Sequence, residues 1–193
     1  MAGGIDFNRG KFKELVLLFA HEAARTGDEG FGMVKLNKLL YHADFEAFRR
    51  FGRPITGASY ERQEFGPVAR PLPLVLDELA AAGRLSWELI ARGDHTAKVP
   101  GLTDDPNAAP DLSQFVDQER DQIRETLRAL ATYGGKSVSH WSHEESAGWR
   151  MVAEDGREIE YETAFFSTKP IPPEDVVRAQ DYLRERGLIK NAS

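Results

Sequence analysis

The sequence predicts a mainly α protein of the α+β class: a compact helical domain that also carries a small β-hairpin and short antiparallel strands. Several segments place apolar residues at helical spacing, and two short strand-like runs flank a Gly-containing turn. The length of 193 residues, of which 41% are hydrophobic and 29% charged, is typical of one ordinary globular domain. We therefore expect residues 1–193 to form a single domain.

The first helix is predicted over residues 9–26, where apolar residues recur at helical spacing. Asp6 or Asn8 can cap its start, because a short polar side chain accepts hydrogen bonds from the free N–H groups of the first turn. Gly27 can end it, since glycine readily adopts the left-handed conformation that follows many helices. The helix is therefore expected to lay one apolar face against the core.

The second helix is predicted from the stretch KLNKLLYHADFEAFRRF, residues 35–51, and is expected to end at Gly52. Its apolar stripe consists of Leu36, Leu39, Leu40, Ala43 and Ala47. Its charged residues are expected to lie mostly off that stripe, namely Lys35, Lys38, Glu46, Arg49 and Arg50. His42 and Glu46 are one turn apart, so we expect a modest surface contact between them.

Residues 53–73 contain repeated Pro and Gly and are predicted to form a loop with a short extended piece at residues 60–65. A third helix is predicted to start at Pro73. Two strand-like runs, residues 85–90 and 96–102, then flank a Gly-containing turn and predict a β-hairpin. A helix followed directly by a hairpin is the local order of a winged-helix unit.

A linker rich in Pro and Asp separates the hairpin from a long fourth helix, predicted over residues 113–134. Asp111 or Ser113 is the expected cap, and the acidic first turns suit the positive end of the helix dipole. After a break at two glycines, a shorter helical piece is expected in residues 136–149.

The C-terminal part, residues 151–193, is expected to contain a strand, a Pro-rich linker and a terminal helix. In residues 157–166, Ile159, Tyr161 and Thr163 alternate with glutamates, which is the pattern of a half-exposed strand. The terminal helix is predicted over residues 174–187.

Composition excludes several classes of function. The formal net charge of −6 argues against a protein whose whole surface binds nucleic acid, although a local basic patch is compatible with it. The chain has no cysteine, which excludes disulfides, thiolate nucleophiles and Cys-based zinc sites. No apolar run reaches the roughly 18 residues that a membrane-spanning helix needs, and no signal sequence is recognisable. We expect a cytoplasmic protein without a membrane partner.

Two histidines provide the sharpest catalytic alternative. His140 and His143 are three residues apart on a predicted helix, so they share a face and could bind a divalent metal. A third ligand, His42 or Asp44, would have to come from a distant segment, and Asp44 points away from the row of His42 and Glu46. Neither a GxSxG turn nor a GxxxxGK[ST] loop is present. We therefore predict no catalytic residue, no metal and no cofactor.

Several motifs, taken in chain order, carry a family resemblance. They are KLNKLLYHAD (35–44), GRPITG (52–57), Tyr60, FGPV (65–68), SHWSHEE (139–145) and Trp149. Together they resemble the Panacea domain of the SocA-like antitoxin family, which also includes phage-associated proteins. The resemblance covers about residues 8–150. It departs at Phe65, where a tyrosine is common, and in the wider spacing between the acidic pair and Trp149.

The resemblance implies a non-enzymatic domain that neutralises a cognate toxin, encoded by a neighbouring gene, through direct protein contact. One recorded mode in the family is delivery of the partner to a protease, so a proteolytic adaptor is an alternative. A DNA-binding regulator is a second alternative, because Arg84 and Arg92 lie near the predicted helix and hairpin. The sequence does not define the oligomeric state, and the resemblance assigns no role to residues 151–193.

The candidate partner-binding or motif residues are Lys35, Lys38, Tyr41, His42, Asp44, Tyr60, Gly66, Pro67, His143, Glu144 and Trp149. Asp44 is either a contact for the partner or a buried structural acid. Trp141 and Trp149 are equally compatible with a core and with an interface. We expect the stretch KLNKLLYHAD to indicate the family rather than to mark the place where the partner binds.

Overall fold

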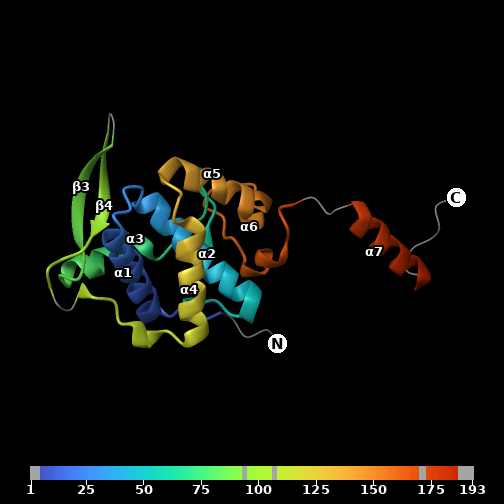
Figure 1. The fold of residues 1–193 in the computed structure, drawn as a ribbon, viewed down its shortest axis with the longest axis horizontal. Helices are drawn as coiled ribbons and strands as arrows, with labels where there is room; N and C mark the ends of the chain where they lie inside the picture. The colour runs from blue at the N-terminus through green and yellow to red at the C-terminus, as the bar shows by residue number, and fades with distance from the viewer. Residues whose placement is uncertain (1–4, 93–94, 106–107, 170–172, 187–193) are drawn as a thin grey trace.

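The computed structural model describes residues 5–92, 95–105, 108–169 and 173–186. Figure 1 shows a helical body, with the hairpin β3–β4 projecting at one end and α7 standing apart at the other. The predicted mainly α fold with short antiparallel strands is confirmed.

The described elements follow one another in a simple order. The helices are α1 (Arg9–Thr26), α2 (Met33–Phe51), α3 (Leu72–Ala81), α4 (Asp117–Leu130), α5 (Gly135–Glu145), α6 (Ala147–Met151) and α7 (Pro173–Glu185). The strands are β1 (Tyr60–Glu61), β2 (Val68–Ala69), β3 (Ser86–Arg92) and β4 (His95–Gly101). Short 3-10 helices occur at Leu112–Gln114 and Tyr161–Phe165. β1 pairs with β2, and β3 with β4, both antiparallel.

α2 is the central helix of the body. α1, α4 and α5 pack against it, as do β2 and the 3-10 helix Tyr161–Phe165. The whole predicted stripe from Leu36 to Ala47 is buried, which confirms the periodicity read from the sequence. Gly52 ends α2 in the left-handed region, with φ of 70°. In the same way, Asn8 caps α1 by accepting a hydrogen bond from the Lys11 N–H, and Gly27 ends it.

The start of α4 differs from the prediction. The helix begins at Asp117 rather than near residue 113, and Asp111 caps the 3-10 turn Leu112–Gln114 instead. The reason is Phe115, which is 2% exposed and whose extended backbone interrupts the helical path while its ring enters the core. The Glu119 carboxylate then accepts a hydrogen bond from the Val116 N–H at 3.0 Å and so caps α4.

The predicted strand at residues 157–166 is wrong. Only one isolated bridge forms, between Glu61 and Glu158, and the chain then closes into the 3-10 helix Tyr161–Phe165. The alternation nevertheless reflects burial, because Ile159 and Tyr161 are 2% and 7% exposed while the neighbouring glutamates face solvent. A short alternating pattern thus marked the inward residues correctly but not the backbone conformation.

The predicted β-hairpin is confirmed, with register from Ser86 opposite Gly101 to Arg92 opposite His95. Its base is held by β4, which packs on α1 and α2 and buries Val99. The hairpin also follows α3 directly, in the order predicted from the sequence.

α7 lies away from the body in Figure 1. Val176 and Val177 on this helix are 38% and 54% exposed. No helix in the described part of the chain is both long and apolar enough to cross a membrane.

We predict that a chain ending at Lys169 unfolds at the same temperature as the full chain, within about 2 °C, because the buried core lies in the body. Circular dichroism melting of the two proteins checks this. A fall of about 5 °C or more in the shortened protein would show instead that α7 contributes to the core.

Candidate functional site

Asp44 lies at the centre of a buried polar cluster. Its side chain is 0% exposed. Oδ1 accepts a hydrogen bond from the Thr56 N–H at 2.7 Å, while Oδ2 accepts from the Thr56 hydroxyl and from the Tyr60 hydroxyl at 2.8 Å. The Tyr161 hydroxyl lies 3.3 Å from Oδ2 and also donates to the Ala58 carbonyl at 2.7 Å. One carboxylate therefore joins α2 to the turn after it, to β1 and to the 3-10 helix.

Burial of Asp44 raises its pKa, because a charged carboxylate loses its hydration inside the core. The hydrogen bonds from Thr56, Tyr60 and Tyr161 oppose that rise, since they stabilise the charged form. Of the two roles left open by the sequence, the geometry matches the buried structural acid. A side chain without exposed surface has no area to offer to a partner.

The two lysines of the motif are buried, although they lie off the apolar stripe of α2 as expected. Lys35 and Lys38 are each 2% exposed. Lys35 is neutralised by Asp28, whose carboxylate lies 2.6 Å from Nζ. Lys38 donates a hydrogen bond to the Pro67 carbonyl at 3.0 Å, and burial lowers its pKa to about 7. The long alkyl stems make this burial possible, because they fill the core while the amine reaches a polar group.

Gly66 and Pro67 form the bend over Lys38. Gly66 has φ of 100°, which favours glycine, and a Cβ at this position would lie 2.7 Å from Lys38 Nζ and 2.5 Å from Ser142 Oγ. The backbone can therefore approach the amine closely only if residue 66 has no side chain. This accounts physically for the glycine of the FGPV motif.

The turn between β1 and β2 is held by side chains of α5 and α6. The Ser139 hydroxyl donates to the Phe65 carbonyl at 2.7 Å, and the Trp149 Nε1–H donates to the Gln63 carbonyl at 2.8 Å. His143 makes a further hydrogen bond to the backbone of Glu64. The C-terminal motif thus satisfies carbonyl groups of a turn that lies far earlier in the chain. The bonds from Ser139 and Trp149 span 74 and 86 residues.

Trp149 is the centre of a stack. The His143 ring lies parallel to it with centroids 3.8 Å apart, and the Arg62 guanidinium lies 4.6 Å from the centroid of the same indole. Burial and the nearby positive charge of Lys38 lower the pKa of His143. Trp149 packs partly buried against the core, as Trp141 does, so both rings belong to the scaffold along much of their surface.

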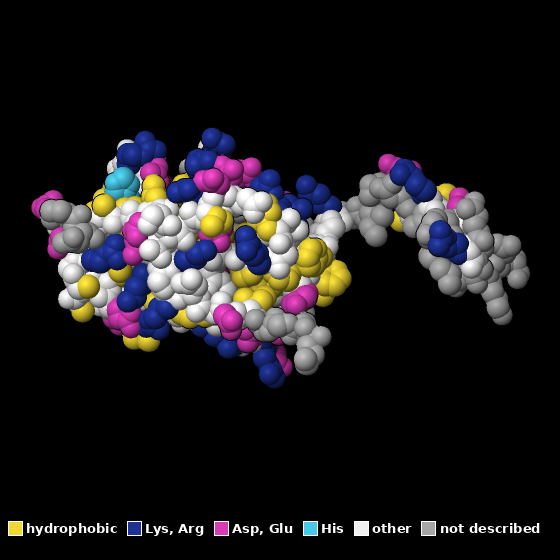
Figure 2. Space-filling view, turned by 90° about the horizontal axis from the view of Figure 1, so that it is seen from below, with side chains coloured by type: hydrophobic (Ala, Val, Ile, Leu, Met, Phe, Trp, Pro, Cys, Tyr) yellow, Lys and Arg dark blue, Asp and Glu magenta, His cyan; other side chains and the backbone are white. Residues whose placement is uncertain are grey.

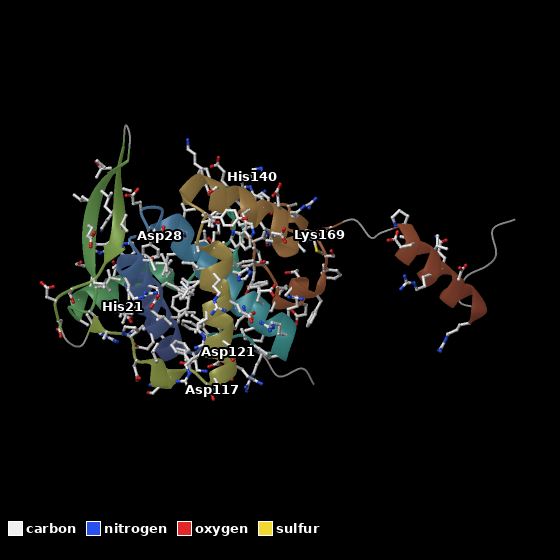
Figure 3. All side chains as sticks on the ribbon, viewed as in Figure 1. His21, Asp28, Asp117, Asp121, His140 and Lys169 are labelled. Carbon is white, nitrogen blue, oxygen red and sulfur yellow. The ribbon has the colours of Figure 1, made fainter. Side chains whose placement is uncertain are left out.

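His140 and Glu144 lie elsewhere. The side chain of His140 is 75% exposed and that of Glu144 is 65% exposed. His140 Nδ1 lies 3.6 Å from Glu144 Oε2 on the outside of α5. Figure 3 places His140 on this outer side. No group of three or more His, Asp and Glu side chains among the described residues is arranged to hold a metal ion. The two histidines have different surroundings, because His143 stacks on Trp149 whereas His140 faces solvent.

Tyr41 and His42 occupy different environments on α2. The Tyr41 hydroxyl lies 2.7 Å from the Ser146 hydroxyl, and its ring stacks on Phe45. Burial raises the pKa of Tyr41. His42 Nδ1 lies 3.0 Å from the Thr126 hydroxyl on α4, and burial lowers the pKa of this histidine.

The predicted contact between His42 and Glu46 is limited to a charge interaction, in which Glu46 opposes the lowering of the His42 pKa. Glu46 accepts hydrogen bonds from Arg49 instead, both on the outer side of α2. His42 is turned toward α4, where a hydrogen-bonding hydroxyl is available. Helical spacing alone could not reveal that α4 would cover this position.

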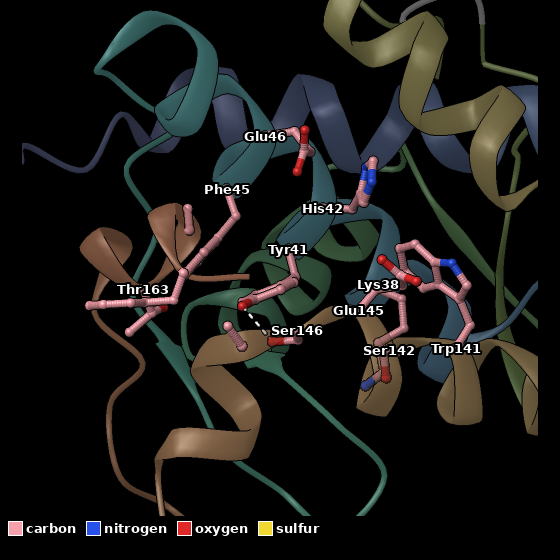
Figure 4. Close-up of a pocket in the computed structure, with 13 residues that line it drawn as sticks. Lys38, Tyr41, His42, Phe45, Glu46, Trp141, Ser142, Glu145, Ser146 and Thr163 are labelled. Atoms are coloured by element: carbon pink, nitrogen blue, oxygen red, sulfur yellow. Dashed lines mark hydrogen bonds between the residues drawn. The ribbon is translucent and has the colours of Figure 1, made fainter. Parts of the chain in front are cut away.

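A small pocket opens beside Tyr41 and has a volume of about 100 Å³. Its wall comes from α2, α5, α6 and the 3-10 helix near Thr163 (Figure 4), with Lys38, His42, Trp141 and Ser142 among its lining residues. Phe166 lies at its edge.

Two large apolar side chains follow one another at this opening, and Phe166 lines it. Phe165 and Phe166 are 60% and 57% exposed, and the Phe165 ring is tilted against Phe48 with centroids 5.5 Å apart. Figure 2 shows hydrophobic side chains gathered at the end of the body from which the chain leads to α7. We call the pocket together with Phe165 and Phe166 the Phe166 surface.

Several residues of the Asp44 cluster and of the Phe166 surface were not among the candidates predicted from the sequence. Thr56 belongs to the quoted GRPITG motif, and Tyr161 was placed on the inward side of an alternating segment, so both carried a signal. Phe165 and Phe166 carried none beyond their size, because a pair of phenylalanines is more often found in a core.

The chain matches a family model described as Antitoxin SocA-like, Panacea domain, over residues 36–150. The match begins inside α2 and ends inside α6, so it contains every candidate residue except Lys35. No curated protein and no solved structure matches the chain.

We predict that replacing Lys38 with Met changes the pH dependence of stability. Because the pKa of Lys38 falls to about 7 on folding, the unfolded chain binds more protons than the folded one from that pH up to about 10.4. The stability of the wild type relative to Lys38→Met should therefore rise with pH through this window, by at most about 1.4 kcal/mol per pH unit.

Urea unfolding of both proteins at several pH values between about 6 and 10 measures this difference. The stability that the wild type gains relative to Lys38→Met at high pH should be fully lost once the pH has fallen through about 7, where the buried amine must carry a charge. Parallel curves for the two proteins would contradict the buried, weakly basic state of Lys38.

Proposed function

Because the chain belongs to the family of SocA-like antitoxins with a Panacea domain, we propose that it neutralises a toxin protein by binding it directly. The partner is a cognate toxin encoded by a neighbouring gene, and the complex forms in the cytoplasm. The activity is non-enzymatic, since occupying the toxin's working surface requires no chemical step.

The observation that supports direct binding is the Phe166 surface. Phe165 and Phe166 expose more than half of their side chains beside a pocket with mixed apolar and polar walls. Exposed aromatic side chains next to a hollow are typical of protein–protein interfaces, where a few such anchors supply most of the affinity. The Phe166 surface is therefore our candidate for the first contact with the toxin.

The polar motif residues support this proposal indirectly. Asp44, Lys38 and Tyr41 are each hydrogen-bonded within the chain and buried. Their task on this account is to hold α2, the β1–β2 turn and the 3-10 helix in one arrangement, which fixes the position of Phe165 and Phe166. Substitution of surface side chains can then adapt the domain to partners of different kinds, while the internal hydrogen-bond network stays the same.

The DNA-binding alternative has less support from the residues concerned. α3, which would be the recognition helix of a winged-helix unit, contains no Lys or Arg and exposes Leu74 and Asp77. Arg84, at the base of the hairpin, is paired with Glu14 at 2.7 Å. Binding to nucleic acid depends on positive charge facing the phosphates, so α3 and the paired Arg84 are poorly suited to it.

We predict that co-expression of the chain with the product of the adjacent gene restores growth and yields a co-purifying complex. Replacing Phe165 and Phe166 together with Ser should weaken the complex by about tenfold or more, because hot-spot aromatics lost from an interface cost about 2 kcal/mol or more. Titration calorimetry measures the affinity.

Leu89→Ser is the matched control, since Leu89 is 75% exposed on the hairpin, away from the Phe166 surface. It should leave the affinity unchanged. A neighbouring product that is harmless and does not bind would refute the proposal. If the toxin binds but its level falls in cells only when a protease is active, the adaptor mode replaces simple occlusion.

A further inference from the structure

A groove lies between α1 and α4. Both helices pack on α2 and leave a hollow of about 370 Å³ between them. This hollow continues into a second one of about 530 Å³ beside the loop after Gly27, and the two share Glu22, Arg25, Leu127 and Arg128. We call the two together the α1–α4 groove. None of its lining residues belongs to the lining of the Tyr41 pocket.

The floor of the α1–α4 groove is apolar. Leu18 from α1 and Ile123 and Leu127 from α4 line it, with Ile123 only 2% exposed. Leu112, at the entrance before α4, is 45% exposed. A floor of this kind gains stability when it is covered by another apolar surface, because its contact with water is removed.

The first hollow of the groove is mainly basic, whereas the second adds Asp28 and Glu29 together with Lys35. Four arginines line the first hollow, against one glutamate, namely Arg25, Arg120, Arg124 and Arg128 against Glu22. This local excess stands out in a chain whose formal net charge is −6. Three of the arginines follow one another at intervals of four residues along α4, so they form a row on one side of the helix.

The helix itself does not require this row. The negative end of the helix dipole accounts for Arg128 in the last turn, but Arg120 lies near the positive end, where a cation is unfavourable. Arg25, Arg120 and Arg124 pair with Glu22, Asp117 and Asp121, each three residues earlier on the same helix. Exposed pairs of this kind stabilise a helix only weakly. The arginines can therefore exchange these partners for others at little cost.

We propose that the α1–α4 groove binds an amphipathic helix of the neutralised toxin. The apolar stripe of that helix lies on the apolar floor of the groove. Its Asp or Glu residues, spaced four apart, pair with the row of Arg120, Arg124 and Arg128. α4 has 14 residues, so the groove accepts a helix of about 20 Å. The inference rests on the proposed function and adds a second surface, with defined partner chemistry, to the Phe166 surface.

Protein is favoured over nucleic acid as the occupant because of the floor. A phosphate backbone would pair with the arginines but would leave Leu18, Leu112 and Leu127 without an apolar partner. An acidic amphipathic helix satisfies both the charged sides and the apolar floor, as in other complexes in which a helix lies in a groove.

The test compares two double charge reversals by titration calorimetry against the product of the adjacent gene. Arg124→Glu with Arg128→Glu changes the groove. Arg150→Glu with Arg157→Glu is the matched control, because both residues are exposed and Arg157 pairs with Glu154 one turn away, as Arg124 does with Asp121. Arg124→Glu alone, in the middle of α4, serves as a second groove variant if the double change lowers the melting temperature.

The groove variants should bind about tenfold or more weakly, with a smaller dependence on salt, while the control keeps the wild-type affinity. Wild-type affinity in the groove variants would overturn the inference and leave the proposed function intact. Failure of the wild-type chain to bind would overturn both. Binding of a short DNA duplex that the groove variants abolish would assign the groove to nucleic acid and overturn the inference.

Discussion

The carboxylate of Asp44 is the interaction on which the rest of the structure depends. It is fully enclosed, and a buried acid is tolerated only when hydrogen-bond donors surround it. Those donors come from the turn after α2, from β1 and from the 3-10 helix that replaces the expected strand. Each of these segments has little regular structure of its own, so a common acceptor on α2 is what fixes their relative positions.

A second hydrogen-bond network also joins separate segments to α2, here through Lys38. The turn between β1 and β2 exposes carbonyl groups that must be satisfied, and Lys38, Ser139 and Trp149 supply the donors. Because these donors come from α2, α5 and α6, the separated motifs of the family meet at one turn. The motif residues therefore specify a scaffold. Lys38, Tyr41 and His42 also line the pocket of the Phe166 surface, whereas Phe166 and Arg124 lie outside the motifs.

Much of the fold could be predicted from local patterns. Helical spacing located α1 and α2. Residue type predicted the cap Gly52 and narrowed the N-cap of α1 to Asp6 or Asn8, of which the structure has Asn8. Errors arose where a distant segment decided the outcome. Lys38 is buried because a bend 29 residues later offers it a carbonyl. The predicted strand instead ends in the 3-10 helix Tyr161–Phe165, where Tyr161 reaches Asp44. The family motifs located the candidate region, but which motif residues would be exposed depended on the packing of α4, α5 and α6.

The central claim is that the motif acts from inside, by holding the scaffold together. The free energy of unfolding of Asp44→Ala, measured by urea denaturation, tests it most directly. Removing the acceptor leaves buried donors on Thr56 and Tyr60 without a partner, so the account predicts a loss of about 3 to 5 kcal/mol. A loss below about 0.5 kcal/mol, as is usual for a surface substitution, would contradict it.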